Sequence, residues 1–393
     1  MGILSMGNVD IEAEKKMMKQ MCIALFALVA LTWNTALAGT ASQQELEARV
    51  AALEAQLAEK EAAPGFNWSD RITLSGTIEL DYSYTADDDV SDKTKENSNS
   101  DLSLGTVELG LEARLHDWVT ANVLLKGEDL DSDDKVFWDE VFVTFQNDAV
   151  PVYAVAGKRC QPFGVFESLF INDAVTQDLY EINKTGLTLG YADEALMGLD
   201  FSVTLYKGET LINRVKDAEY GWERDTVAGY TETDTVNSYI ISAGIAPAEG
   251  MHMSVFFNSE PGDSDRNSTL GAAVHWDGFG FTADAEYIGA LERELHRTDN
   301  KEYKEKAWTI SLGYQVMEPL LVALRYEGFD SDRGNAGDLE SRYSAGVTYT
   351  VLETEYLTTS LMGEYRRSNY DTKAGSNNDK DLDELFARLA LEF

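Results

Sequence analysis

Apolar and polar residues alternate along the chain from residue 72 onward. In the first run one face holds only apolar residues and a glycine, while the other face holds only polar residues; the apolar face consists of Ile72, Leu74, Gly76, Ile78, Leu80, Tyr82 and Tyr84. Strands of soluble proteins are usually shorter than this run. A tilted strand with lipid on one side and water on the other needs both the length and the alternation. The pattern therefore predicts a membrane-spanning strand.

The same alternation recurs along the rest of the chain, and short connections alternate with long ones. Bacterial barrels have short periplasmic turns, long external loops and an even number of strands. We expect residues 68–393 to form an all-β, transmembrane antiparallel β-barrel of about sixteen strands in the bacterial outer membrane. The predicted strands are 71–84, 102–115, 119–128, 136–146, 151–157, 185–191, 198–207, 236–246, 251–258, 268–276, 279–288, 305–314, 319–328, 340–350, 358–367 and 383–393.

The last predicted strand ends on an aromatic residue. Phe393 closes an alternating run whose apolar face is Leu385, Ala387, Leu389, Leu391 and Phe393. Such an ending resembles the assembly signal of outer-membrane proteins. We expect Phe393 to act as that signal toward the barrel-assembly machinery, and we expect outer-membrane lipid and lipopolysaccharide to surround the folded barrel.

The first 38 residues have the features of an export signal. A basic stretch at 15–19 precedes an apolar run at 21–31, and Ala36-Leu37-Ala38 follows as a small-residue cleavage box. These three features together are typical of a secretory signal peptide. We expect residues 1–38 to be removed on export.

A short helix is predicted at residues 42–62. Leu46, Val50, Leu53 and Leu57 repeat at spacings of four, three and four, which is the a/d spacing of a coiled coil. Two heptads are marginal for a coiled coil in isolation. A periplasmic coiled coil and an amphipathic helix that lies on another surface therefore both fit the pattern.

The composition narrows the classes of partner. The chain has 69 acidic and 32 basic residues, and its net charge is −37. So strong a negative charge repels nucleic-acid phosphates, and we expect no nucleic-acid partner.

Cys160 is the only cysteine beyond the signal peptide, so no internal disulfide is expected. No stretch beyond residue 38 approaches the roughly 18–20 apolar residues of a membrane helix.

A motif at residues 157–167 resembles a known family. It reads Gly-Lys-Arg-Cys-Gln-Pro-Phe-Gly-Val-Phe-Glu, and Asn-Asp-Ala-Val-Thr-Gln-Asp-Leu follows at 172–179. The motif is similar to that of the LbtU-type siderophore porin family, whose members also combine a signal peptide, a short coiled coil and a barrel of this length. Ala174 departs from the family pattern, which tends to have proline there. The resemblance implies passive or facilitated diffusion of a small solute, with a ferric siderophore, a ferric chelate, as the cargo.

The segment 159–184 is predicted to be the third external loop. In porins this loop often folds inward and narrows the pore; the alternative is an external lid. Pro162 restricts the backbone and Gly164 permits a turn. The candidate constriction and substrate-contacting residues are Lys158, Arg159, Pro162, Phe163, Gly164, Phe166, Glu167 and Asp173.

Four arginines are predicted to face the pore from consecutive strands. By alternation they lie on the polar face of the last four strands; they are Arg325, Arg342, Arg366 and Arg388. One interpretation is a basic arc that faces the acidic loop and sets a transverse field across the pore. The alternative is local pairing with Glu327, Glu364 and Glu392 on the same strands.

The sequence offers little for catalysis or for cofactor binding. His252 and Ser254 share a strand face, but alternation turns them toward the pore and no acyl-enzyme motif accompanies them. The four histidines lack metal-ligand spacing, so we expect no enzyme activity, no metal and no cofactor.

Two alternatives to a siderophore porin remain. They are a general or ion-selective diffusion porin and a structural tether of the outer membrane. A homotrimer is the usual assembly for a barrel of sixteen strands.

Overall fold

The computed structural model describes the chain from residue 71 onward, with gaps. The described residues are 71–87, 98–128, 130, 135–147, 149–166, 169–217, 235–262, 265–295, 300–332, 339–370 and 382–393. The predicted signal peptide at 1–38 and the predicted helix at 42–62 lie outside the described residues.

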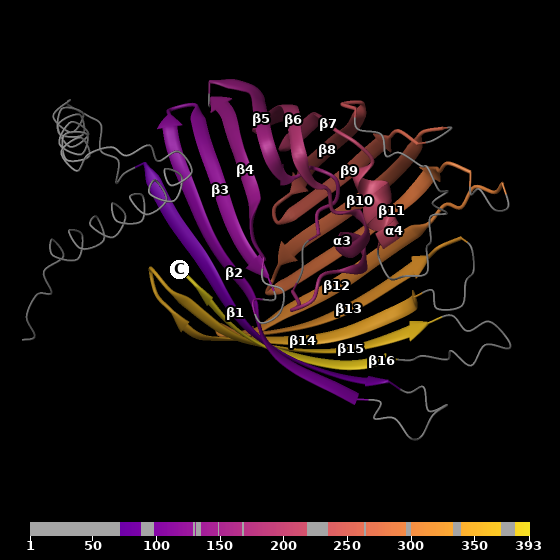
Figure 1. Ribbon diagram of the computed structural model, residues 1–393. Helices are drawn as coiled ribbons and strands as arrows, with labels where there is room; N and C mark the ends of the chain where they lie inside the picture. Colours follow the sequence, from indigo (N-terminus) through magenta and orange to yellow (C-terminus); the bar gives the residue numbers. More distant parts are fainter. Residues whose placement is uncertain are drawn as a thin grey trace, which may run out of the picture. The chain divides into compact units, whose positions relative to one another are not determined.

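Sixteen antiparallel strands form one closed barrel (Figure 1). Each strand pairs with its neighbours in sequence, and β1 pairs with β16. The predicted strand number and the antiparallel order are therefore confirmed. The strands are β1 Ile72–Asp87, β2 Ser98–His116, β3 Val119–Glu128, β4 Lys135–Asn147, β5 Val150–Cys160, β6 Asn183–Asp193, β7 Leu199–Tyr206, β8 Ser238–Ala248, β9 Met251–Glu260, β10 Asn267–Gly278, β11 Phe281–Glu292, β12 Lys306–Met317, β13 Leu320–Asp330, β14 Leu339–Glu353, β15 Thr358–Tyr370 and β16 Leu382–Glu392.

The first and last strands close the barrel along their whole overlap. Leu80 lies opposite Leu389, and Asp81 lies opposite Arg388. At one end of the seam the Gly76 amide donates to the Phe393 carbonyl oxygen at 2.9 Å, and the Phe393 amide donates to the Gly76 carbonyl oxygen at 3.0 Å. Closure pairs the two edges of the sheet with each other, which is what a lipid environment requires.

The two faces of the barrel wall differ in the way that the alternation predicts. Apolar side chains on the outer face are exposed, as in Leu324 at 63% and Ile310 at 53%. Their neighbours on the inner face are polar and buried, as in Arg325 and Glu327. No helix in the described part of the chain is long and apolar enough to span a membrane.

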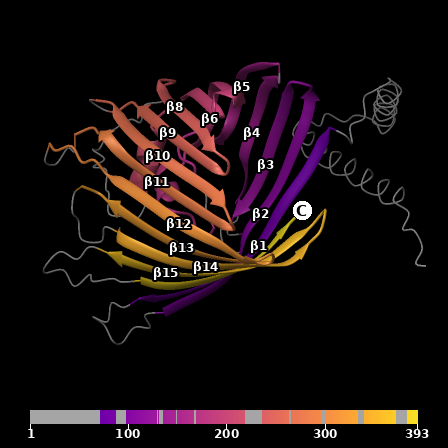
Figure 2. The same cartoon turned by 180° about the vertical axis from the view of Figure 1, so that it is seen from behind.

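Two helices lie inside the ring of strands and fill part of the barrel interior, which we call the lumen (Figure 1). Figure 2 shows the ring of strands from behind. They are α3 (Val175–Tyr180) in the loop between β5 and β6, and α4 (Thr210–Asp217) after β7. A short 3-10 helix, η2 (Glu194–Leu196), lies in the turn between β6 and β7. Both α-helices share a buried apolar cluster with inward residues of the wall from β7 to β14; its members include Phe163, Val175, Leu179, Ile182, Leu211, Ile212, Val215, Ile240, Phe256, Ile288 and Phe329.

Candidate functional site

The loop between β5 and β6, residues 161–182, turns into the lumen and is called here the anchored loop. Its neck closes where the Gln161 amide donates to the Ile182 carbonyl oxygen at 2.8 Å. Gly164 then adopts a φ of 98°, in the left-handed region that L side chains rarely occupy. A Cβ at Gly164 would lie 2.0 Å from the Phe166 ring. The inward turn therefore requires glycine at this position.

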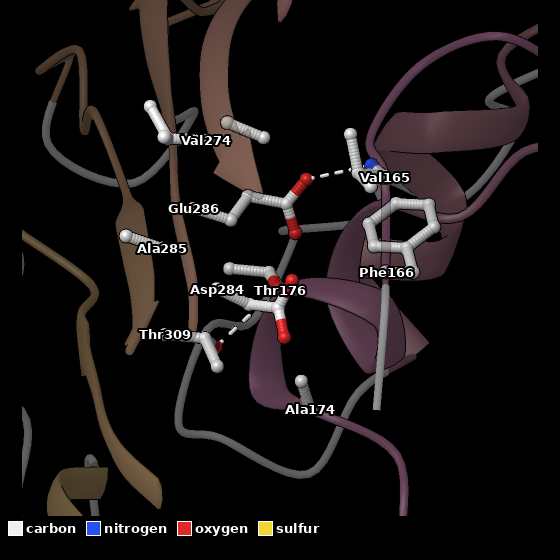
Figure 3. A pocket seen from close by; sticks show the side chains of 10 residues that line it. Val165, Phe166, Ala174, Thr176, Val274, Asp284, Ala285, Glu286 and Thr309 are labelled. Carbon is white, nitrogen blue, oxygen red and sulfur yellow. Dashed lines mark hydrogen bonds between the residues drawn. The ribbon is translucent and has the colours of Figure 1, made fainter. Parts of the chain in front are cut away.

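Three glutamates on alternate wall strands hold the anchored loop by its backbone. Glu286 on β11 accepts the Val165 amide at 2.8 Å, and Figure 3 shows this bond. Glu327 on β13 accepts the Val175 amide at 2.6 Å. Hydrogen bonds to an ionised acceptor are stronger than those between neutral groups. These bonds explain why the loop lies against the wall and not over the barrel mouth.

The third glutamate, Glu364 on β15, holds the tip of the anchored loop. It accepts both the backbone amide and the side-chain amide of Asn172, each at 3.0 Å. Two wall glycines make room for the apolar side chains beside it, because a Cβ at Gly313 would lie 2.6 Å from Leu169 and a Cβ at Gly346 would lie 3.0 Å from Phe170. The loop tip is therefore fixed by shape as well as by charge.

A small cleft lies under the anchored loop, against β10 to β12. Asp284 and Glu286 line it from the wall, and Thr176 and Ala174 line it from the loop (Figure 3). The hydroxyl oxygens of Thr176 and Thr309 are 3.3 Å apart. The cleft belongs to the seam between loop and wall.

A fourth glutamate holds α4 in the lumen. Glu260 on β9 is fully buried and accepts the Leu211 amide at 2.8 Å and the Ile212 amide at 3.1 Å. The Tyr206 hydroxyl also donates to Glu260, at 2.6 Å. An anion at the N-terminal end of a helix is stabilised by the unpaired amides there. Glu260 therefore fixes α4 in place.

Helix α4 in turn supports α3. The Arg214 guanidinium donates to the Asp178 carbonyl oxygen at 2.9 Å and to the Gln177 carbonyl oxygen at 3.2 Å, and it lies 3.4 Å from a Glu181 carboxylate oxygen. Carbonyl groups at the end of a helix favour a cation beside them. The two helices thus form one layer on the β7–β14 side of the lumen.

The residues of the motif at 157–167 differ from one another in burial and in contacts. Phe163 is buried, with its ring 5.1 Å from that of Phe256. Arg159 lies over the inward ring of Phe142 at 5.9 Å. Pro162 and Phe166 are half-buried, and Phe166 has a φ of 54°. Glu167 lies outside the described residues.

Lys158 lies on strand β5 and not in the loop that follows it. Strand β5 continues to Cys160, and its register places Lys158 opposite Val141, whose side chain is exposed on the outer face. The Lys158 ammonium donates to the Trp138 carbonyl oxygen at 2.7 Å. Strand β5 therefore runs three residues beyond the predicted strand 151–157 and includes Lys158, whose place at the constriction stays a prediction.

Arg325 contacts the anchored loop directly and does not lie across the pore from it. The Arg325 guanidinium lies over the Phe170 ring at 4.5 Å and donates to the Asn172 carbonyl oxygen at 2.9 Å. It also lies 3.0 Å from Glu327 and 3.5 Å from Glu364. Arg325 is thus part of the loop attachment.

The other three arginines also face inward and have partners on the wall. Arg342 is buried, and its Nε donates to the Ser368 hydroxyl at 3.0 Å. Arg366 pairs with Glu384 through bonds of 2.7 and 3.0 Å. Arg388 pairs with Asp81 through two bonds of 2.7 Å and lies 3.0 Å from Glu79. Glu392 was the expected partner on β16, but the carboxylates seen at Arg388 come from β1 across the closing seam.

The side of the lumen away from the helices carries charged residues that neither the motif nor the arginine pattern indicated. We call the inward face of β16, β1, β2 and β3 the passage wall. Lys126 on β3 lies 2.8 Å from Glu128 and 3.6 Å from Glu108. The side chains of Lys126 and Asp81 keep exposed fractions of 24% and 23%, in contrast to 1% for Arg325. The alternation in 102–115 and 119–128 is the signal that could have found Glu108 and Lys126, because it places both on the inner face.

Asp173 on the anchored loop lies toward the passage wall. Its side chain is exposed, and its charge interacts with those of Lys126 and Arg388. Loss of hydration inside the barrel raises the pKa of Asp173, and the nearby Glu181 charge raises it further. The structure also brings Asp173 into contact with a predicted wall residue, because the Arg325 guanidinium donates to the Asp173 carbonyl oxygen at 3.3 Å.

The remaining chemical candidates form no further site. His252 lies opposite His275 and Ser254 lies opposite Ala273, on the inner face as the alternation predicted. Within the described ranges, no three His, Cys, Asp or Glu side chains are grouped so as to hold a metal ion.

Comparisons with known proteins agree on the fold. No protein-family model matches the chain. A UPF0422 protein of Coxiella burnetii is 25% identical over 345 residues, which cover 84% of this chain and 71% of that protein. The outer membrane channel DcaP of Acinetobacter baumannii has a TM-score of 0.57 at 13% identity, over 84% of this chain and 99% of the channel. An anion-selective porin from Comamonas acidovorans has a TM-score of 0.57 at 11% identity, over 82% of this chain and 99% of the porin. This likeness shows a porin-like outer-membrane barrel fold.

Proposed function

We propose that this bacterial outer-membrane barrel is a channel for the passive or facilitated diffusion of small solutes. The observation that carries the proposal is the division of the lumen. The anchored loop and α4 cover the wall from β7 to β14, whereas charged side chains on the passage wall remain partly exposed. A passage bounded by Asp173 on one side and by Arg388 and Lys126 on the other follows from this division.

The specific cargo that we propose is a ferric siderophore. The support for this cargo is the resemblance of the 157–167 motif to the LbtU-type siderophore porins. Phe163 and Gly164 of that motif shape the anchored loop, so the motif has a structural part in building the constriction. Arg159, Pro162, Phe166 and Asp173 remain the candidate contacts for the solute, together with Arg366 and Arg388 on the wall.

A general or ion-selective diffusion porin is the second candidate. The ion pairs on the passage wall favour this second candidate. Fixed charges of both signs can interact with hydrated ions and small polar solutes, and such a channel needs no dedicated binding site. A structural tether of the outer membrane is the third hypothesis, and it requires no open passage.

Single-channel recording of the purified protein in planar bilayers separates these hypotheses. We expect stable conductance steps, because the passage wall carries charged side chains that remain partly exposed. Saturation of the current or block by an added ferric chelate supports the siderophore cargo, and an ohmic current that the chelate leaves unchanged supports the general porin. Absence of conductance from a folded barrel contradicts the proposed function and leaves the tether.

The partners proposed for the barrel follow from its location. We propose a homotrimer surrounded by lipopolysaccharide and outer-membrane lipid and assembled by the barrel-assembly machinery. The mass of the detergent-solubilised particle tests the trimer, because a monomeric particle in mild detergent contradicts it.

A further inference from the structure

The charges along the passage wall are not balanced. Among the inward residues of the passage wall whose side chains the structure describes, seven are acidic and three are basic. The acidic residues are Glu79, Asp81, Glu108, Glu112, Glu128, Glu384 and Glu392, and the basic residues are Arg114, Lys126 and Arg388. The excess of carboxylates leaves the passage with a net negative charge at neutral pH.

The excess arises because single cations are shared between two carboxylates. Arg388 lies within 3.0 Å of both Glu79 and Asp81. Lys126 lies 2.8 Å from Glu128 and 3.6 Å from Glu108. Each of these two clusters therefore carries one negative charge more than its cation neutralises.

The opposite side of the lumen does not compensate for this charge. Many inward residues from β7 to β14 form an apolar cluster with the two helices, and its members have little or no exposure. The buried cations there have partners: Arg293 pairs with Glu305, Arg325 pairs with Glu327, and Arg342 donates to the Ser368 hydroxyl. A largely apolar side facing a charged wall concentrates the field in the water between them.

We propose that the passage selects cationic over anionic solutes, with Glu79, Asp81, Glu108 and Glu128 as the residues that set the selectivity. The inference rests on the proposed channel function and names the charge class of the solutes that pass. Cations are concentrated in the passage, and anions are depleted from it. Among ferric chelates of similar size, a cationic one enters more readily than an anionic one.

Reversal potentials of the full-length protein in planar bilayers under a KCl gradient test the proposal. We expect the sign that corresponds to potassium preference, and a preference that weakens at high salt, because the Debye length shortens from about 10 Å at 0.1 M to about 3 Å at 1 M. A reversal potential of zero or of the chloride sign overturns the selectivity and leaves the channel function intact. Absence of any conductance counts against the channel function itself.

The double variant Glu79→Gln/Glu108→Gln assigns the selectivity to these residues. Each glutamine keeps the size of the side chain, and each cation retains one carboxylate partner, Asp81 or Glu128. We expect the potassium-to-chloride permeability ratio to fall by about twofold or more, on the scale by which wall charges change local ion concentrations.

The matched control is Glu249→Gln, which removes the same charge from the exposed turn between β8 and β9. We expect the control to keep the permeability ratio of the unmodified protein. An unchanged ratio in the double variant, with circular dichroism showing a folded barrel, contradicts the assignment of selectivity to the passage wall.

Discussion

Carboxylates inside the barrel fall into two groups according to their contacts. Glu260, Glu286, Glu327 and Glu364 accept backbone amides of the inward segments. Glu79, Asp81, Glu108 and Glu128 contact arginine or lysine on the wall and remain partly exposed. We therefore expect changes in the first group to alter loop position and changes in the second group to alter selectivity.

Glu327→Ala is predicted to loosen the anchored loop. The substitution leaves the Val175 amide without its acceptor and removes a carboxylate from Arg325, both of them buried. Breaking a buried ion pair from one side typically costs about 3–5 kcal/mol. We expect larger and noisier conductance steps and a lower thermal unfolding temperature. The control Glu318→Ala lies in the exposed β12–β13 turn, and a variant at Glu327 that behaves like this control contradicts the attachment.

Asp173 is predicted to make the cation preference depend on pH. Its pKa is raised by lost hydration and by Glu181, against the opposing charges of Lys126, Arg214 and Arg325. An acid with a raised pKa becomes neutral at a higher pH than an ordinary aspartate as the pH falls. On acidification we expect the cation preference to decrease at a higher pH than an ordinary aspartate would give, and we expect Asp173→Asn to lack this step. Identical pH profiles for the two proteins contradict the prediction.

The anchored loop is an element whose path depends on one glycine. At φ 98° a side chain on Gly164 is strained and meets the Phe166 ring. Gly164→Ala is expected to cost about 1–2 kcal/mol in loop stability and to expose the loop to proteases. Gly363→Ala is the control, because a Cβ there has ordinary contact distances and the backbone is extended. Equal protease resistance of the two variants contradicts this account.

Helix α4 depends on the apolar cluster more than on its own sequence. Eight residues are too few for a stable helix in water. Ile212 is fully buried among the side chains that α3 and the wall contribute. Ile212→Ala is expected to reduce stability by about 2–5 kcal/mol, because it leaves a cavity in this cluster. Thermal unfolding followed by circular dichroism measures the loss, and a change below about 1 kcal/mol contradicts the packing described here.

At the scale of the whole molecule, closure of β1 on β16 joins residues at opposite ends of the barrel sequence. The Phe393 backbone pairs with Gly76, and a Cβ at Gly76 would lie 2.5 Å from the Phe393 ring. Phe393→Ala is expected to reduce the amount of folded barrel in the outer membrane, since Phe393 is the proposed assembly signal. Leu361→Ala, also on the outer face, is the control, and an equal yield of both variants contradicts a special part for Phe393.

Alternation alone is sufficient for the strands and for the side of the wall on which most residues lie. Lipid on one face and water on the other impose a period of two on each strand, and this period by itself places Arg325, Arg366 and Arg388 on the inner face. Lipid and water impose no comparable pattern that marks the residue at which a strand ends. The predicted strand 151–157 ended three residues early for this reason, because β5 continues to Cys160, beyond the point where the apolar run fades.

The position of the anchored loop and the division of the lumen were decided by the tertiary structure. The Val175 amide and Glu327 are 152 residues apart, and the Asn172 amide and Glu364 are 192 residues apart. Nothing in the local sequence of either partner specifies the other. The sequence by itself determined a membrane barrel, because each strand must satisfy lipid and water separately; only the closed barrel determined which carboxylates hold the loop and which line the passage, because that choice depends on distances across the lumen.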